Sequence, residues 1–245
     1  MKSLRITGTL LTATCVVGLV GAASAMALST NNPQWLVLAS VLLAGQAVAI
    51  DAEANGVQDF NSTGLTIECK KFRLAAGAVL IGSNAPAPGI SEEGIRYLEC
   101  EFAGFPACKI NGAVPGEGET KPLRGLLVFL TKSGALNEEA DTSGILFKPK
   151  TAATFAEFGL SGTCPLTGTV KVEGTGLLVN NLTDNHEVTH ELEAPAVAKK
   201  AYYLNEGGVT RERTGIKLEM AGLLATYVGK EKVLLASKER WGIFN

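Results

Sequence analysis

Short strand-like stretches separated by turn residues constrain the fold of this 245-residue chain more than any other feature. Glycine, proline, asparagine and aspartate recur between these stretches, at intervals of roughly 8–15 residues. Residues 65–69, 95–102 and 167–172 alternate between apolar and polar, which indicates strands with one buried face. Residues 126–130 are continuously apolar, as expected of a strand that is buried on both faces. The pattern predicts an all-β protein, a sandwich or barrel of about ten or more short strands in a single domain.

Two segments fit this pattern less clearly. Residues 35–50 are almost wholly apolar, which suits a helix, but two strands that turn near Ala44 and Gly45 fit the rest of the chain better. Residues 195–204 suit a short helix and a loop equally. Loops are expected at 83–89, 115–121 and 133–143.

The first 27 residues have the organisation of a secretory signal peptide. Lys2 and Arg5 precede a mostly apolar stretch over residues 6–21, which is short for the ~20 residues that span a membrane. Cleavage after Ala27 leaves one β-rich domain over residues 28–245. We therefore predict a protein that is secreted, either extracellular or at the cell surface, with no membrane span after cleavage.

The cysteines remaining after cleavage are Cys69, Cys100, Cys108 and Cys164. An even number in an exported chain predicts disulfides, since the spacings lack the paired knuckles of a zinc ribbon. A glycine and a proline between Cys100 and Cys108 favour a turn, so we expect the pairs Cys100–Cys108 and Cys69–Cys164. The competing pairing joins Cys69 to Cys100 and Cys108 to Cys164, and the apolar–polar alternation of the strands alone does not exclude it.

Charge is nearly balanced, with 22 basic and 24 acidic residues and no long run of one sign. A nucleic-acid-binding surface or a polybasic membrane patch would need a cluster of basic residues, and no such cluster is visible in the sequence. The sequence therefore predicts no nucleic-acid partner.

Both histidines of the chain fall in one HExxH motif, residues 186–190. On a helix, His186 and His190 would share one face and could bind a zinc ion, with Glu187 as general base. Glu206 follows at a distance that suits a third ligand. This alternative function is a secreted zinc metallopeptidase. However, the segment also alternates with a period of two, and on a strand the histidines would lie ~13 Å apart and could not share a metal. We favour the strand, with no catalytic residue, no metal ligand and no cofactor.

The remaining candidates for functional residues are carboxylates and aromatic side chains. Two glutamate pairs, at 92–93 and 138–139, are flanked by glycine-containing stretches and are interpreted as solvated turns. Trp35, Trp241 and the tyrosines at 202–203 could form a platform on which sugars stack. Because aromatic residues make up only 6% of the chain, we expect both tryptophans to pack in the core instead.

The cysteine frame resembles that of a family of exported bacterial proteins with no assigned activity. The likeness is carried by LTIEC before and including Cys69, YLEC at Cys100, CKI at Cys108 and TCPLTG around Cys164, with Trp35 and the closing WGIF at 241–244. It covers nearly the whole chain and implies a secreted β-rich protein with a strand over residues 186–194. It transfers no functional residue. The sequence thus favours a non-enzymatic structural or binding component of the envelope or the extracellular space, with other envelope proteins or glycans as partners.

Overall fold

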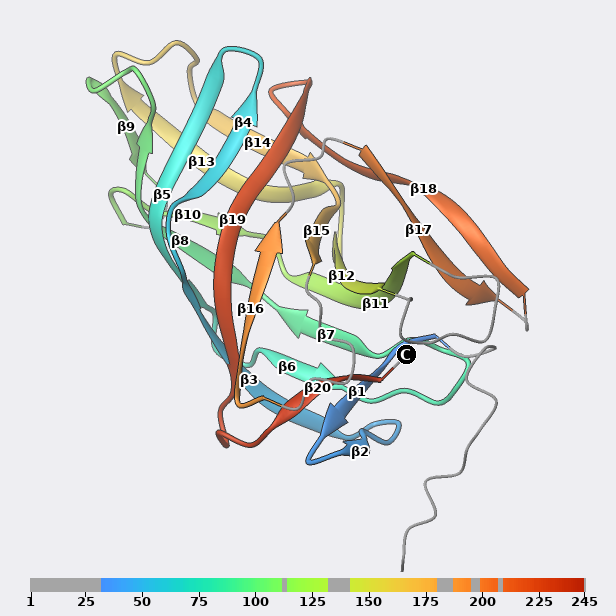
Figure 1. Cartoon of the computed structure of the whole chain (residues 1–245). Coiled ribbons are helices and arrows are strands. Elements are labelled where there is room, and N and C mark those ends of the chain that lie inside the picture. The colour runs from blue at the N-terminus through green and yellow to red at the C-terminus, as the bar shows by residue number, and fades with distance from the viewer. Residues whose placement is uncertain are drawn as a thin grey trace, which may run out of the picture.

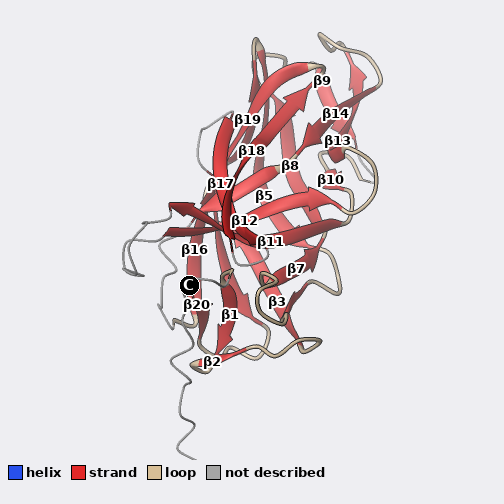
Figure 2. Cartoon of the chain, turned by 90° about the vertical axis from the view of Figure 1, so that its right-hand side faces the viewer, coloured by secondary structure: helices blue, strands red, loops and turns tan. Residues whose placement is uncertain are grey.

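The computed structural model describes residues 32–111, 114–131, 142–179, 187–194, 199–206 and 209–244. The expected signal peptide at 1–27 lies outside these residues. All regular structure in the described residues is β-strand, which confirms the all-β prediction (Figure 2). In the same part of the chain, no helix has the length and apolar character that crossing a membrane requires.

The strands are numbered in the order of the chain (Figure 1). The first ten are β1 (Gln34–Val37), β2 (Ser40–Val41), β3 (Ala47–Ala54), β4 (Gln58–Ser62), β5 (Leu65–Leu74), β6 (Val79–Ile81), β7 (Ile90–Glu93), β8 (Ile95–Phe102), β9 (Cys108–Asn111) and β10 (Gly118–Thr120). The others are β11 (Leu123–Thr131), β12 (Thr142–Pro149), β13 (Thr154–Gly162), β14 (Thr169–Gly174), β15 (Gly176–Val179), β16 (Thr189–Ala194), β17 (Lys199–Glu206), β18 (Val209–Met220), β19 (Leu223–Leu235) and β20 (Trp241–Phe244).

Antiparallel pairing closes one set of strands into a ring. The order is β19, β4, β5, β8, β10, β13, β14 and β18, and β18 pairs again with β19. Phe60, Tyr97, Phe158 and Tyr227 come from four of these strands and meet inside the ring, with centroid distances from 4.9 to 6.2 Å. Period-2 alternation therefore fills the interior with aromatic rings.

A second ring uses the other half of β19. Its order is β19, β3, β6, β7, β11, β12, β15 and β16, and β16 returns to β19. On β11, the fully buried Leu127 joins the main core, while its neighbour Val128 joins a second core under β17 and β18. The continuously apolar run at 126–130 is thus buried on both faces, as predicted.

A small sheet of β2, β1 and β20 packs beside the second ring. The segment 35–50 forms strands rather than a helix, and it turns near Ala44 and Gly45 as expected, where the Gln46 N–H donates to the carbonyl oxygen of Leu43 at 2.9 Å. A second tight turn, at Leu38 and Ala39, was not expected. Neither a helix nor a loop describes residues 199–204, which belong to β17; residues 195–198 lie outside the described part of the chain. The strand conformation of β17 places the side chain of Tyr202 in the second core, and this burial favours the strand.

The expected bridge between Cys100 and Cys108 is wrong, because the register of the strands sets the pairing. Cys69 lies directly opposite Cys100 in the β5–β8 ladder, with Cα atoms 4.0 Å apart, and the two are bonded. The neighbouring pair of Glu101 with Lys109 leaves Cys100 and Cys108 out of register with each other.

The second bridge therefore joins Cys108 to Cys164, not Cys69 to Cys164. Cys108 lies opposite Gly162 at the end of β13, and Cys164 follows two residues later. The two Cα atoms are 4.5 Å apart. The alternative that the sequence left open is thus the one that the structure contains.

Candidate functional site

The last two residues of the HExxH segment, Thr189 and His190, belong to strand β16, and Glu187 before them forms an isolated β-bridge. His190 is buried in β16, and its Nε2 lies 2.7 Å from the carbonyl oxygen of Trp241. Because a carbonyl oxygen only accepts, this nitrogen carries the proton and offers no lone pair to a metal. His186 lies outside the described residues.

The other two residues of the zinc alternative lie on separate elements. Glu187 is exposed, and its backbone pairs with Trp241. Glu206 ends β17, where its carboxylate accepts from the guanidinium of Arg213, with the Nε 3.2 Å away. Within the described ranges, no group of three or more His, Cys, Asp or Glu side chains is placed to hold a metal. The helical arrangement that the zinc alternative requires is not formed by Glu187, His190 and Glu206.

Both tryptophans are fully buried, which confirms their predicted place in the core. The ring centroids of Trp35 and Trp241 are 6.0 Å apart, and Trp35 Nε1 donates to the carbonyl oxygen of Ile90 at 2.8 Å. Tyr202 is buried in the second core and Tyr203 is half-buried. These rings do not form an exposed platform.

The glutamates at 92–93 are not in a solvated turn, because both belong to β7. Glu92 forms an ion pair with Lys150 at 2.8 Å. Glu93 keeps part of its surface exposed, but burial of its carboxyl raises the pKa to about 7, against a smaller opposing effect of a hydrogen bond from Ser91. The pair at 138–139 lies outside the described residues.

A second buried carboxyl, Glu231 of β19, interacts with Glu93. Burial first, and then the charge of Glu93, raise the pKa of Glu231. Nearby, the Tyr227 hydroxyl donates to Gln58 Oε1 at 2.6 Å. No sequence motif pointed to this cluster; the signal for it was that Glu231 shares the inward parity of Tyr227 and Val233. Since Glu231 is only 6% exposed, the cluster suits proton uptake by the folded protein rather than contact with a substrate.

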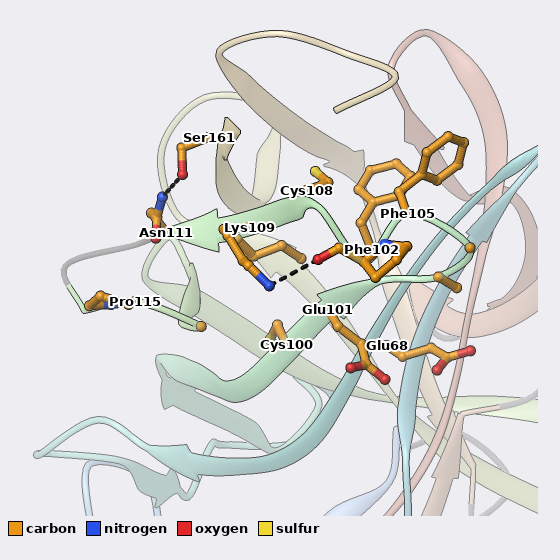
Figure 3. A pocket seen from close by; sticks show the side chains of 15 residues that line it. Glu68, Cys100, Glu101, Phe102, Phe105, Cys108, Lys109, Asn111, Pro115 and Ser161 are labelled. Carbon is orange, nitrogen blue, oxygen red and sulfur yellow. Dashed lines mark hydrogen bonds between the residues drawn. The ribbon is translucent and has the colours of Figure 1, made fainter. Parts of the chain in front are cut away.

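An open pocket of about 700 Å³ lies where β8 and β9 diverge (Figure 3). The chain around Gly116 separates the two strands: Cys100 N–H donates to the carbonyl oxygen of Gly116 at 2.8 Å, and Gly116 N–H donates to that of Ile110 at 2.6 Å. The two strands pair only through Glu101 and Lys109. The pocket therefore follows from a segment inserted between β8, which belongs to the first ring, and the neighbouring β9.

Polar side chains and one exposed aromatic ring line this pocket. Glu68 and Glu101 are directly opposite in the β5–β8 ladder and lie side by side on one wall (Figure 3). Across from them, the amide of Asn111 donates to the hydroxyl of Ser161. Phe105 is 39% exposed and packs edge-on against the buried Phe102, with centroids 5.6 Å apart.

Both disulfides brace the pocket walls. Cys100 and Cys108 line the pocket, and each is one end of a different bridge, so β8 is bonded to β5 and β9 to the segment that follows β13. Restraints of this kind reduce the ordering that binding a ligand requires. The sequence pointed to the cysteines but not to the pocket, because the pocket depends on where the strands separate.

Comparison with known proteins does not assign the chain to a family. No family model, curated protein or solved structure matches the chain. A function has to be argued from the residues of the site itself, because a fold alone does not specify one.

Proposed function

We propose that this protein is an exported, non-enzymatic β-protein that binds glycans in the pocket between β8 and β9. The observation that carries the proposal is the exposed ring of Phe105 beside carboxylate and amide groups on a disulfide-braced frame. A sugar ring presents an apolar C–H face and a rim of hydroxyls, which suit an aromatic face and planar polar groups. The pocket volume is within the range of ~300–1,000 Å³ of small-ligand sites.

Export is supported by the signal-peptide pattern and by the disulfides, which form in oxidising compartments. The resemblance to exported bacterial proteins agrees with the same location. Glycans and other envelope proteins are the partners that such a location offers.

The arrangement of the carboxylates favours binding over hydrolysis. A glycosidase places its two carboxyl groups on either side of the scissile bond. Glu68 and Glu101 instead lie side by side on one wall of the pocket. They can accept hydrogen bonds from neighbouring hydroxyls of a sugar but do not flank a bond between two sugars.

A glycan microarray probed with the exported protein tests the proposal. We expect selective binding, and a loss of about two- to tenfold in affinity for Phe105→Ala, because a ring contact contributes ~0.5–1.5 kcal/mol. Leu223→Ala is the matched control, since Leu223 is 45% exposed but lies at the start of β19, outside the pocket lining. Absence of any bound glycan, or equal binding by Phe105→Ala and the control, would refute the proposal.

Zinc content separates this proposal from the peptidase alternative. The exported protein is expected to contain no stoichiometric zinc, with or without His190→Ala. One zinc per chain that His190→Ala removes would instead support the peptidase.

A further inference from the structure

The hairpin of β1 and β2 and the residues after it expose several large apolar side chains. Leu38 is 59% exposed and Leu43 is 63% exposed, with Val41 between them also exposed. Leu42 is buried and anchors the segment to the core. We call residues 38–44 the apolar tip; Figure 1 shows this hairpin at one end of the molecule.

The turn of the apolar tip keeps its leucine in an unfavourable backbone conformation. Leu38 and Ala39 form the two-residue turn between Val37 and Ser40, with φ angles of 50° and 63°. Positive φ at both positions favours Asn-Gly, because a leucine side chain crowds the backbone there. An exposed leucine that the local geometry disfavours calls for a role beyond folding.

Basic side chains lie at the same end. The connection between β19 and β20 carries the exposed Lys238 and Arg240, and the Leu38 N–H donates to the carbonyl oxygen of Arg240 at 3.0 Å. The acidic residue between them, Glu239, accepts a hydrogen bond from Ser237 at 2.9 Å. This connection is thus net basic in a chain with a net charge of −2.

We propose that the apolar tip docks on the surface of an anionic lipid bilayer. Leu38 and Leu43 would enter the boundary between headgroups and acyl chains, while Lys238 and Arg240 would lie at the level of the phosphates. The pocket near β9 lies at the opposite end in both views (Figures 1 and 2). Docking by the tip therefore leaves the pocket directed away from the bilayer.

Sedimentation with lipid vesicles tests this proposal, using the protein recovered after export of the full chain. Vesicles of phosphatidylcholine with about one third phosphatidylglycerol should bind it more tightly than phosphatidylcholine alone. Two tip variants, Leu38→Asn with Ala39→Gly, and Leu43→Ser, should each weaken binding about fivefold or more. The first variant supplies the residues that the turn prefers, so its melting temperature should be unchanged or higher.

Matched variants define the outcomes. Leu223→Ser with Leu224→Ser, at 45% and 44% exposure at the start of β19, should bind vesicles like the wild type. Lys238→Glu with Arg240→Glu should remove the preference for anionic lipid. Failure of the wild type to sediment, equal losses in tip and control variants, or a dimer that Leu43→Ser dissociates in the absence of vesicle binding would each overturn the proposal.

Discussion

Glu231 is an acidic side chain on an inward face whose neighbours Tyr227 and Val233 are aromatic and aliphatic. Its interaction with Glu93 makes the interior of the protein sensitive to proton concentration. In the unfolded chain the pKa of Glu93 is 4.5, and in the folded protein it is about 7. Between these pH values the folded state holds a proton that the unfolded state has released. Stability conferred by these protons is therefore lost as the pH rises through this window.

Glu93→Gln should remove much of this pH dependence. The unfolding free energy of the wild type should fall, through Glu93, by about 3 kcal/mol between pH 4.5 and a pH above 7, and that of the variant should fall less. Urea unfolding across this range measures the difference. Glu53→Gln, at an exposed position of β3, is the control and should keep the wild-type dependence. The same pH dependence in Glu93→Gln and the wild type would contradict the buried-pair account.

At the scale of elements, alternation predicts which residues face inward but not which strands meet. The sequence indicated strands at 65–69 and 95–102, because alternation depends on local parity, and the low aromatic content indicated the burial of both tryptophans. The closure of two rings through β19 depends on pairings between distant segments, which no local pattern specifies. For the same reason the disulfide pairing, the place of Glu93 in β7 and the pocket beside Gly116 were not predictable.

The observed disulfides predict similar losses of stability when either bridge is removed. The closed loops span 31 and 56 residues, so the chain-entropy model gives roughly 4 kcal/mol for each. Unfolding of Cys69→Ser with Cys100→Ser, and of Cys108→Ser with Cys164→Ser, measures the two losses. Peptide mapping without reduction should recover both bridges. A linked Cys100–Cys108 peptide, or a loss from one bridge several times that from the other, would contradict this pairing.

The whole molecule separates its two proposed interaction sites along its length. The disulfide-braced pocket is near β9, and the apolar tip is beside β2 at the other end (Figure 2). The strands of the two rings connect these ends, and β19 belongs to both rings. A continuous hydrogen-bonded framework of this kind suits a protein that holds a ligand at a fixed distance from the surface to which it attaches.

The most direct test of glycan binding in the pocket is to map the bound glycan on the folded protein. Backbone amide signals of the purified protein are recorded by nuclear magnetic resonance during titration with the glycan that the microarray selects. We predict the largest shifts at residues 101–111 and at Ser161, with the signals of residues 38–44 unchanged. Shifts confined to another surface, or none at glycan concentrations that saturate the microarray signal, would contradict the account.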